Sequence, residues 1–227
     1  MKNIPPPRCD FEIYIAKNNT QWGEREPSDS LQSLYSLGYL PYSGAATMQG
    51  IFYTARSARV LLQNFFPSSE NRRIARKFDG HFKKESISMS QFVPTEEFFE
   101  FCLTYFSQKH GAKAMPRERL ETILESGLIS RVVVYTKDSL PVAYVLEAEE
   151  GSMGHFWFSF YDLSYIKQSL GLWLMLDCIR DAKARGLVYY YLGTVYGEKA
   201  LYKLNFKPLE WWNEILWSSD TKLLKVL

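Results

Sequence analysis

The 227-residue sequence predicts an α+β fold with one mixed sheet, preceded by a smaller N-terminal lobe. Apolar segments at residues 130–135, 141–147 and 154–161 are separated by short turns, which is typical of an antiparallel meander. A long amphipathic segment at 169–185 then leads into a very apolar segment at 187–192, which has the composition of a central parallel strand. We expect the lobe to span residues 1–90 and the main domain to span residues 91–227.

The expected lobe shows weaker patterns than the rest of the chain. Its first eight residues are rich in Pro, and a short helix is predicted over 30–37, ended by Gly38. Residues 51–53 and 58–66 suit strands, although 61–66 would also suit a helix. Residues 68–77 suit a helix, with Ser68 or Ser69 as its N-cap.

The main domain opens with two helices, one from Thr95 to Gly111 and one from Pro116 to Gly127. After the three strands, the helix at 169–185 ends at Gly186. A short helix at 198–204 and a strand at 214–218 follow the apolar segment at 187–192. This order of elements resembles that of GNAT acyltransferases, which is a likeness of fold alone.

Composition limits the kinds of protein this can be. The chain is 46% hydrophobic and its net charge is +2, so any nucleic-acid footprint must be local. It has neither a signal peptide nor an apolar run of about 18 residues, so we expect a cytoplasmic protein without a membrane span. The three cysteines, Cys9, Cys102 and Cys178, lack metal-ligand spacing, so we expect no metal site.

Two features of the GNAT likeness concern the reaction. Tyr202 lies four residues before Phe206, where GNAT enzymes commonly carry the Tyr that protonates the leaving group; it would otherwise cover the sheet as an amphipathic residue. The turn that cradles a CoA pyrophosphate would correspond to residues 168–173, where Trp173 replaces a small residue. We expect its indole to crowd that turn and to disfavour CoA.

Four segments together resemble the arginyl-tRNA–protein transferase family, including its bacterial aspartate/glutamate leucyltransferase branch. They are FPSSENRR at 66–73, FSFYD at 158–162 with SLG at 169–171, YLG at 191–193, and YKLNFKPLE at 202–210. The chain departs from the family in three places: residues 50–59 contain no Cys cluster, Leu163 replaces a Pro, and Ser69-Glu70 replaces a more basic pair. The resemblance therefore identifies a divergent member.

The resemblance implies aminolysis of the ester that joins Arg or Leu to tRNA, without a further cofactor. The acceptor would be the free amine of a protein or peptide, with an acidic N-terminal residue. Asp162 would accept the excess proton or anchor the donor's amine, unless it only caps the following loop. Strand amides near 158–160 would stabilise the oxyanion, and Tyr202 would protonate the departing ribose hydroxyl. Oligomeric state stays open.

The resemblance also implies which residues contact the substrates. Lys203 would bind the terminal phosphate or an acceptor carboxylate, and the catalytic set would include Ser169. Arg72 and Arg73 would bind tRNA or an acidic side chain. Residues expected to contact the substrate further include Tyr161 and Gly171. The rest of the basic run would contact tRNA phosphates or form a solvated face, and it comprises Arg76, Lys77, Lys83 and Lys84.

Two other functions fit the sequence. One is a CoA-dependent N-acyltransferase of the GNAT type. The other is a non-catalytic module that keeps the fold and binds tRNA ends or acidic N-termini. The three histidines (His81, His110 and His155) are scattered, and a structural hydrogen bond is the preferred interpretation of His155.

Overall fold

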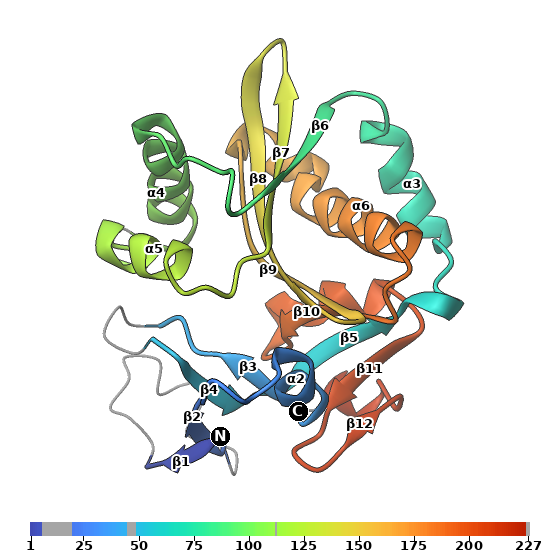
Figure 1. The fold of residues 1–227 in the computed structure, drawn as a ribbon. Coiled ribbons are helices and arrows are strands. Elements are labelled where there is room, and N and C mark those ends of the chain that lie inside the picture. Colours follow the sequence, from blue (N-terminus) through green and yellow to red (C-terminus); the bar gives the residue numbers. More distant parts are fainter. Residues whose placement is uncertain (6–19, 45–48, 112, 226–227) are drawn as a thin grey trace.

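The computed structural model describes residues 1–5, 20–44, 49–111 and 113–225, and their strands form two sheets (Figure 1). The smaller sheet has the strand order β1-β2-β4-β3, and every pairing in it is antiparallel. Its strands are β1 (Lys2–Ile4), β2 (Trp22–Glu24), β3 (Tyr39–Pro41) and β4 (Ile51–Thr54). The short helix α2 (Leu31–Ser36) lies within the predicted range 30–37, packs near β3 and has Ser30 as its N-cap.

The larger sheet has eight strands in the order β12-β11-β5-β10-β9-β8-β7-β6. Its only parallel pairing joins β9 and β10 in the described residues, so the sheet is mixed, as predicted. The strands are β5 (Ser57–Leu61), β6 (Lys83–Ser88), β7 (Arg131–Lys137), β8 (Leu140–Glu150), β9 (Met153–Tyr161), β10 (Tyr189–Thr194), β11 (Leu209–Trp212) and β12 (Trp217–Ser218).

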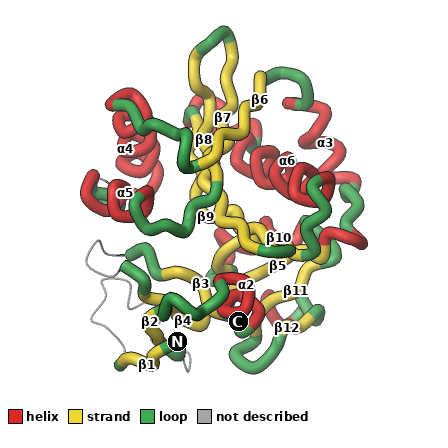
Figure 2. The backbone as a smooth tube through the Cα atoms, in the orientation of Figure 1, coloured by secondary structure: helices red, strands yellow, loops and turns green. Residues whose placement is uncertain are grey.

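Helices cover both faces of the larger sheet (Figures 1 and 2). On one face lie α4 (Glu96–His110), capped by Thr95 and ended by Gly111, and α5 (Arg117–Leu124). On the other face lie α3 (Ser69–Phe78), whose N-cap is Ser68, and α6 (Leu170–Ala184). The predicted inner stripe of α6 is buried throughout: Leu170, Leu174, Leu176, Ile179 and Ala182. None of the helices in the described ranges is long and apolar enough to cross a membrane.

The parallel pairing of β9 and β10 is short, and this determines where a pocket forms. The two strands are in register from Met153 and Tyr189 only as far as His155 and Tyr191. The register between β8 and β9 shifts at the next residues, where Phe156 and Phe158 face successive residues of β8. Trp157 is therefore an extra residue in a β-bulge, which bends a strand. Beyond His155, β9 is paired on one side only.

Several elements differ from those expected. Residues 83–88 form the strand β6, and residues 209–212 form the strand β11, neither of which was expected. Of the strand expected at 214–218, only residues 217–218 are present, as β12. The segment 58–66 divides into β5 and the 3-10 helix η1 (Leu62–Asn64), and residues 198–205 form the 3-10 helix η3 (Glu198–Asn205). The local pattern around 61–66 suits both states, so its pairing with β10 and β11 decides how far the strand extends.

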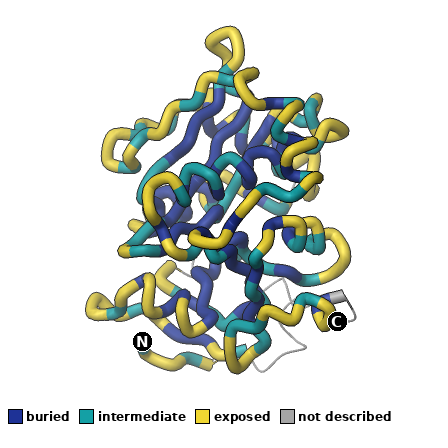
Figure 3. Tube along the Cα trace, turned by 90° about the vertical axis from the view of Figure 1, so that its right-hand side faces the viewer, coloured by how far each residue is buried: buried dark blue, intermediate teal, exposed yellow. Residues whose placement is uncertain are grey.

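The expected division near residue 90 stays a prediction, but β5, α3 and β6 join the larger sheet and its helices. The central strands of this sheet are largely buried (Figure 3), and Cys102 of α4 and Cys178 of α6 are buried free thiols in the core that the helices form with the sheet. A second apolar cluster, which includes Tyr35, Phe52 and Tyr191, lies between the two sheets. Cys9 lies outside the described residues.

Candidate active site

A pocket of about 270 Å³ lies where β9 leaves β10, at the start of α6. We call it the transfer pocket. Its lining combines the half of β9 that pairs with β8 alone with residues from α4, α6 and η3: Lys109, Phe156, Ser159, Tyr161, Ser169, Gly171, Leu172 and Tyr202. It therefore brings together Tyr161, Ser169, Gly171 and Tyr202 from the residues that the sequence predicts.

The bulge in β9 explains which of its side chains reach the pocket. Ser159 and Tyr161 are two residues apart, so they share a face of the strand. Regular alternation would add Trp157 to that face, but the extra residue shifts the pattern, and Phe156 lines the pocket instead. Because this part of β9 has lost its partner β10, the strand edge that faces the pocket is free of sheet pairing.

The start of α6 is shaped by Ser169 and Gly171. Ser169 has φ 69° and ψ 37°, in the left-handed region, and its hydroxyl makes no capping hydrogen bond. A Cβ atom on Gly171 would lie 2.9 Å from Cε1 of Tyr161, closer than side chains tolerate. The absence of a side chain at Gly171 thus lets the Tyr161 ring lie against the helix.

Tyr202 contributes a hydroxyl group to the same pocket from η3. The residue is 42% exposed, so part of it remains open to solvent at the pocket. Burial, and next the neighbouring Tyr161 hydroxyl, raise the pKa of Tyr202 to about 12. The group therefore stays protonated near neutral pH and can donate a proton or hydrogen bond.

Lys109 is a pocket residue that no motif in the sequence indicates. Its ammonium donates to the hydroxyl of Tyr105 over 2.5 Å and to that of Tyr161 over 3.0 Å. It also lies 4.8 Å and 4.7 Å from the centroids of those two rings. Among the described residues that line the transfer pocket, it carries the only charge. In sequence it resembles any cation in the last turn of a helix, which the helix dipole already explains.

Asp162 and Lys203 do not line the transfer pocket. Asp162 lines a neighbouring groove and accepts a hydrogen bond from the Ser164 amide over 2.8 Å, so it caps the turn that follows β9. Lys203 is 8% exposed, and its ammonium donates to the Thr194 carbonyl over 2.6 Å. Burial lowers the pKa of Lys203 to about 8.

His155 has a structural hydrogen bond at the point where β9 and β10 separate. Its Nδ1 is 2.8 Å from the hydroxyl of Tyr35, which comes from α2. Burial, followed by the nearby Lys203 ammonium, lowers the pKa of His155 to about 3. The imidazole is therefore neutral, and its hydrogen bond joins α2 to the larger sheet at this point.

The basic run lies on α3 and β6, against α6, and none of its residues lines the transfer pocket. Arg72 donates to the Pro67 carbonyl, and Arg73 forms a bidentate pair with Glu70. Lys84 pairs with two carboxylates of α6, 2.8 Å from Asp177 and 3.4 Å from Asp181. Most of the exposed surface of the run comes from Arg72, Arg73, Arg76 and Lys83, with Lys77 half-buried.

Trp173 does not crowd the start of α6, so that expectation is wrong. Its side chain is 4% exposed and packs against the rings of Phe78, Phe82 and Tyr135. Its indole N–H donates to Asp79 over 2.8 Å. Position 173 lies on the inner face of the helix, one turn after Ser169, and the ring therefore points into the core.

The motif segments around Tyr191 and Glu210 are structural. Arg59 of β5 donates to Glu210 over 2.9 Å and to the Tyr191 hydroxyl over 3.2 Å. Its guanidinium is also 4.0 Å from the centroid of Tyr189 and 4.1 Å from that of Trp217. These contacts hold β5, β10 and β11 together. This structural role explains why Tyr191 and Glu210 occupy these positions, and it requires no part in the reaction.

No group of three His, Cys, Asp or Glu side chains in the described ranges is placed to hold a metal ion.

Residues 102–204 match the family model described as "Acetyltransferase (GNAT) domain". A crystal structure of FemX superposes with a TM-score of 0.50 at 10% identity, covering 78% of this chain and 64% of that one. This superposition supports the fold alone.

Two curated relatives are named aspartate/glutamate leucyltransferase. The protein from Methylorubrum extorquens is 31% identical over 172 residues, which covers 68% of this chain and 67% of that protein. The protein from Paracoccus denitrificans is 29% identical over 181 residues, covering 71% of this chain and 63% of that protein. The chain therefore belongs to the aspartate/glutamate leucyltransferase family, a family of aminoacyl transferases, and it carries the acyltransferase domain of the GNAT fold.

Proposed function

We propose that the chain transfers an amino acid, leucine or arginine, from aminoacyl-tRNA to the free amine of a protein or peptide. The observation that carries this proposal is the transfer pocket, where Tyr202 meets the unpaired edge of β9 at the start of α6. Family membership supports aminoacyl transfer, and the names of the relatives favour leucine.

The proposed reaction is the aminolysis of an ester. The acceptor nitrogen attacks the ester carbonyl, an amide bond forms, and the bond to the ribose oxygen breaks. The amine loses one proton to the solvent, and the ribose oxygen gains one as it leaves. The ester is already activated, so positioning of the two substrates can supply about 7–11 kcal/mol of the rate enhancement.

Each part of the transfer pocket suits one demand of this reaction. The free edge of β9 offers backbone amides to the oxyanion that forms at the carbonyl. Tyr202, with its pKa of about 12, is protonated at neutral pH and gives its proton to the departing ribose oxygen. Lys109 supplies the pocket's positive charge, and it suits the phosphate next to the esterified ribose.

The rest of the tRNA requires further phosphate contacts, which weaken as salt is added. Arg72, Arg76 and Lys83 are exposed and suit such contacts. Lys84 does not suit them, because its ammonium is held by the carboxylates of α6.

Transfer of a labelled acyl group tests the proposal. The protein is incubated with peptides of varied N-terminal residue and with labelled Leu-tRNA, Arg-tRNA or acetyl-CoA. We expect transfer from an aminoacyl-tRNA and none from acetyl-CoA. The acetyl-CoA arm is essential because Trp173 leaves the start of α6 open. Transfer from acetyl-CoA alone would contradict the proposal, and tRNA binding without transfer from any donor would support a non-catalytic module instead.

A further inference from the structure

The hydroxyl group of Tyr161 has an O–H that no described residue accepts. The side chain lines the transfer pocket and is 6% exposed. In the described part of the chain, its oxygen accepts a hydrogen bond from Lys109 over 3.0 Å, and the hydroxyl itself donates none. Buried polar groups without a partner are rare in folded proteins, so a ligand that accepts this O–H is the simplest explanation of it.

Two residues of α4 hold the Tyr161 oxygen from one side. The Lys109 ammonium carries donors only, so the oxygen must accept from it. Lys109 also donates to the Tyr105 hydroxyl over 2.5 Å. Burial, followed by the electrostatic effect of Tyr161 and a hydrogen bond to it, raises the pKa of Tyr105. A hydrogen bond raises the pKa of a phenol when the phenol donates, so the Tyr161 oxygen accepts from Tyr105 as well.

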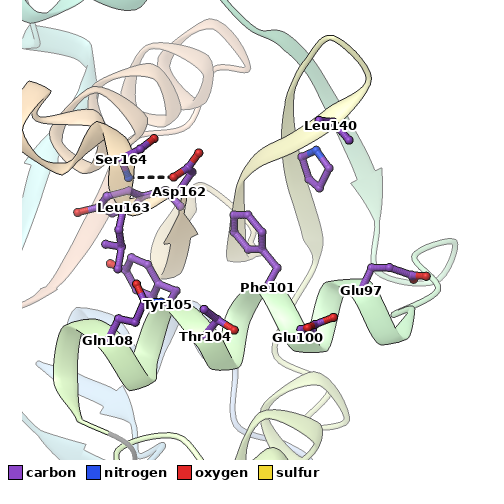
Figure 4. Close-up of a pocket in the computed structure, with 12 residues that line it drawn as sticks. Glu97, Glu100, Phe101, Thr104, Tyr105, Gln108, Leu140, Asp162, Leu163 and Ser164 are labelled. Atoms are coloured by element: carbon purple, nitrogen blue, oxygen red, sulfur yellow. Dashed lines mark hydrogen bonds between the residues drawn. The ribbon is translucent and has the colours of Figure 1, made fainter.

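The O–H of Tyr161 therefore points away from α4. Tyr105 projects from α4 into the lining of a groove of about 570 Å³, which lies between this helix, the start of β8 and the turn where η2 (Leu163–Gln168) begins (Figure 4). Tyr161 lines both this groove and the transfer pocket. On the side of α6, a Cβ atom on Gly171 would lie 3.1 Å from the Tyr161 oxygen. That side belongs to the transfer pocket, and the O–H is directed into it.

Tyr161 and Tyr202 place two neighbouring hydroxyl groups in the transfer pocket. The tetrahedral centre that forms during aminolysis carries two oxygens of the ester, the former carbonyl oxygen and the ribose oxygen. Tyr202 protonates the ribose oxygen in the reaction proposed above, which leaves the O–H of Tyr161 for the carbonyl oxygen. The Lys109 ammonium polarises this O–H, and a hydrogen bond to an oxyanion is about twice as strong as one between neutral groups.

We propose that the Tyr161 hydroxyl donates a hydrogen bond to the carbonyl oxygen of the aminoacyl ester as it becomes an oxyanion, and that Lys109 is the positioning residue that orients this hydroxyl. The inference rests on the proposed function and adds a side-chain donor to the amides of β9. Such a donor is in place before the reaction starts. Tyr161 keeps its proton throughout, and Lys109 still has a third N–H for the donor's phosphate.

Single-turnover transfer by Tyr161→Phe tests the inference through the reaction. With saturating aminoacyl-tRNA, we expect amide formation to slow by about 10²-fold while donor affinity stays unchanged. Tyr144→Phe is the matched control, because it removes a hydroxyl from the neighbouring strand β8, where the ring packs against Phe98 and Phe101 outside the lining of the transfer pocket. It should leave the rate unaltered. Wild-type transfer with an unchanged rate in Tyr161→Phe would overturn the inference and leave the proposed function intact.

Equilibrium binding tests the same inference without turnover. Calorimetric titration compares two analogues of leucyl-adenosine that lack a 5′ phosphate: a planar amide, and a tetrahedral phosphonate with an anionic oxygen in the place of the oxyanion. We expect the wild type to bind the phosphonate more tightly, and Tyr161→Phe to reduce this preference by at least about tenfold.

Lys109→Met should reduce the preference for the phosphonate as well, although neither analogue offers Lys109 a phosphate. Lys113→Met, at an exposed position just after α4, is its control and should retain the preference. Equal losses of affinity for both analogues in Tyr161→Phe would indicate a packing role alone and would overturn the inference, as would a wild type that does not prefer the phosphonate. Failure of the proposed function would appear separately, as transfer from acetyl-CoA alone.

Discussion

Replacement of Lys203 by Met should raise the free energy of unfolding above that of the wild type, and this gain should be larger at neutral pH than at alkaline pH. Lys203 is 8% exposed, and burial lowers the pKa of its ammonium from 10.5 to about 8. Below pH 8 both folded and unfolded chains carry the proton, and the folded state bears the full cost of the buried charge. Between pH 8 and 10.5 the unfolded chain binds more protons, so wild-type stability rises with pH. The shift corresponds to about 3 kcal/mol.

Urea unfolding followed by Trp fluorescence at pH 7, 8, 9 and 10 measures this effect as a difference between the wild type and Lys203→Met. Groups that both proteins share contribute equally and cancel in this difference in the free energy of unfolding. From pH 7 to pH 10 the difference should shrink by most of the expected total of about 3 kcal/mol. Lys199→Met, at an exposed position of the same 3-10 helix, serves as the control and should show no trend. A pH-independent difference for Lys203→Met would refute the reasoning and would indicate a hydrated ammonium that is available to an anionic substrate.

Two further substitutions test the packing that surrounds the transfer pocket. Gly171→Ala places a methyl group 2.9 Å from Cε1 of Tyr161, so the ring must shift. We expect the free energy of unfolding to fall by about 1 kcal/mol, measured by thermal melts, and the initial rate of transfer to fall as well. Unchanged transfer in that variant would show that the Tyr161 position is unimportant. Arg59→Met leaves Glu210 and the Tyr191 hydroxyl without their donor, and because Glu210 is partly exposed we expect a loss of about 2 kcal/mol in urea unfolding. A loss below about 0.5 kcal/mol would show that this cluster does not hold β5 in place.

Local signals in the sequence were sufficient for the helices and for the meander. The helix α4 begins after Thr95 and ends before Gly111, as predicted. An N-cap and a glycine with positive φ depend only on neighbouring residues of the chain, so the sequence shows both ends of the helix. The stripe of α6 was correctly predicted for the same reason, since its period depends on the helix alone.

The place of β5 in the sheet depends on distant partners and was not predictable in this way. Its residues pair with β10 and β11, more than a hundred residues further along the chain. A short mixed segment such as Ser57–Leu61 suits a strand, but its residues do not show between which strands it lies. The same holds for β6, whose two lysines concealed a strand that pairs with β7.

The transfer pocket was predictable in part. Tyr202, Ser169 and Gly171 lie in short motifs, so the sequence could select them, and the structure brings them together. Lys109 has no motif, and only the approach of α4 to Tyr161 makes it a pocket residue. The prediction that Trp173 crowds the start of α6 was wrong. The presence of Trp one turn into a helix does not show whether its side chain faces the core or the pocket.

The single-turnover rate of Tyr202→Phe tests most directly whether the transfer pocket performs the reaction. With saturating aminoacyl-tRNA and a fixed acceptor peptide, we expect amide formation to slow by about 10²-fold while donor affinity stays unchanged. Tyr165→Phe removes a hydroxyl from a residue that packs against Phe78 and Phe82, outside the transfer pocket, and should leave the rate unaltered. An unchanged rate for Tyr202→Phe would contradict the account, because the protonated hydroxyl of this pocket would then take no part in transfer.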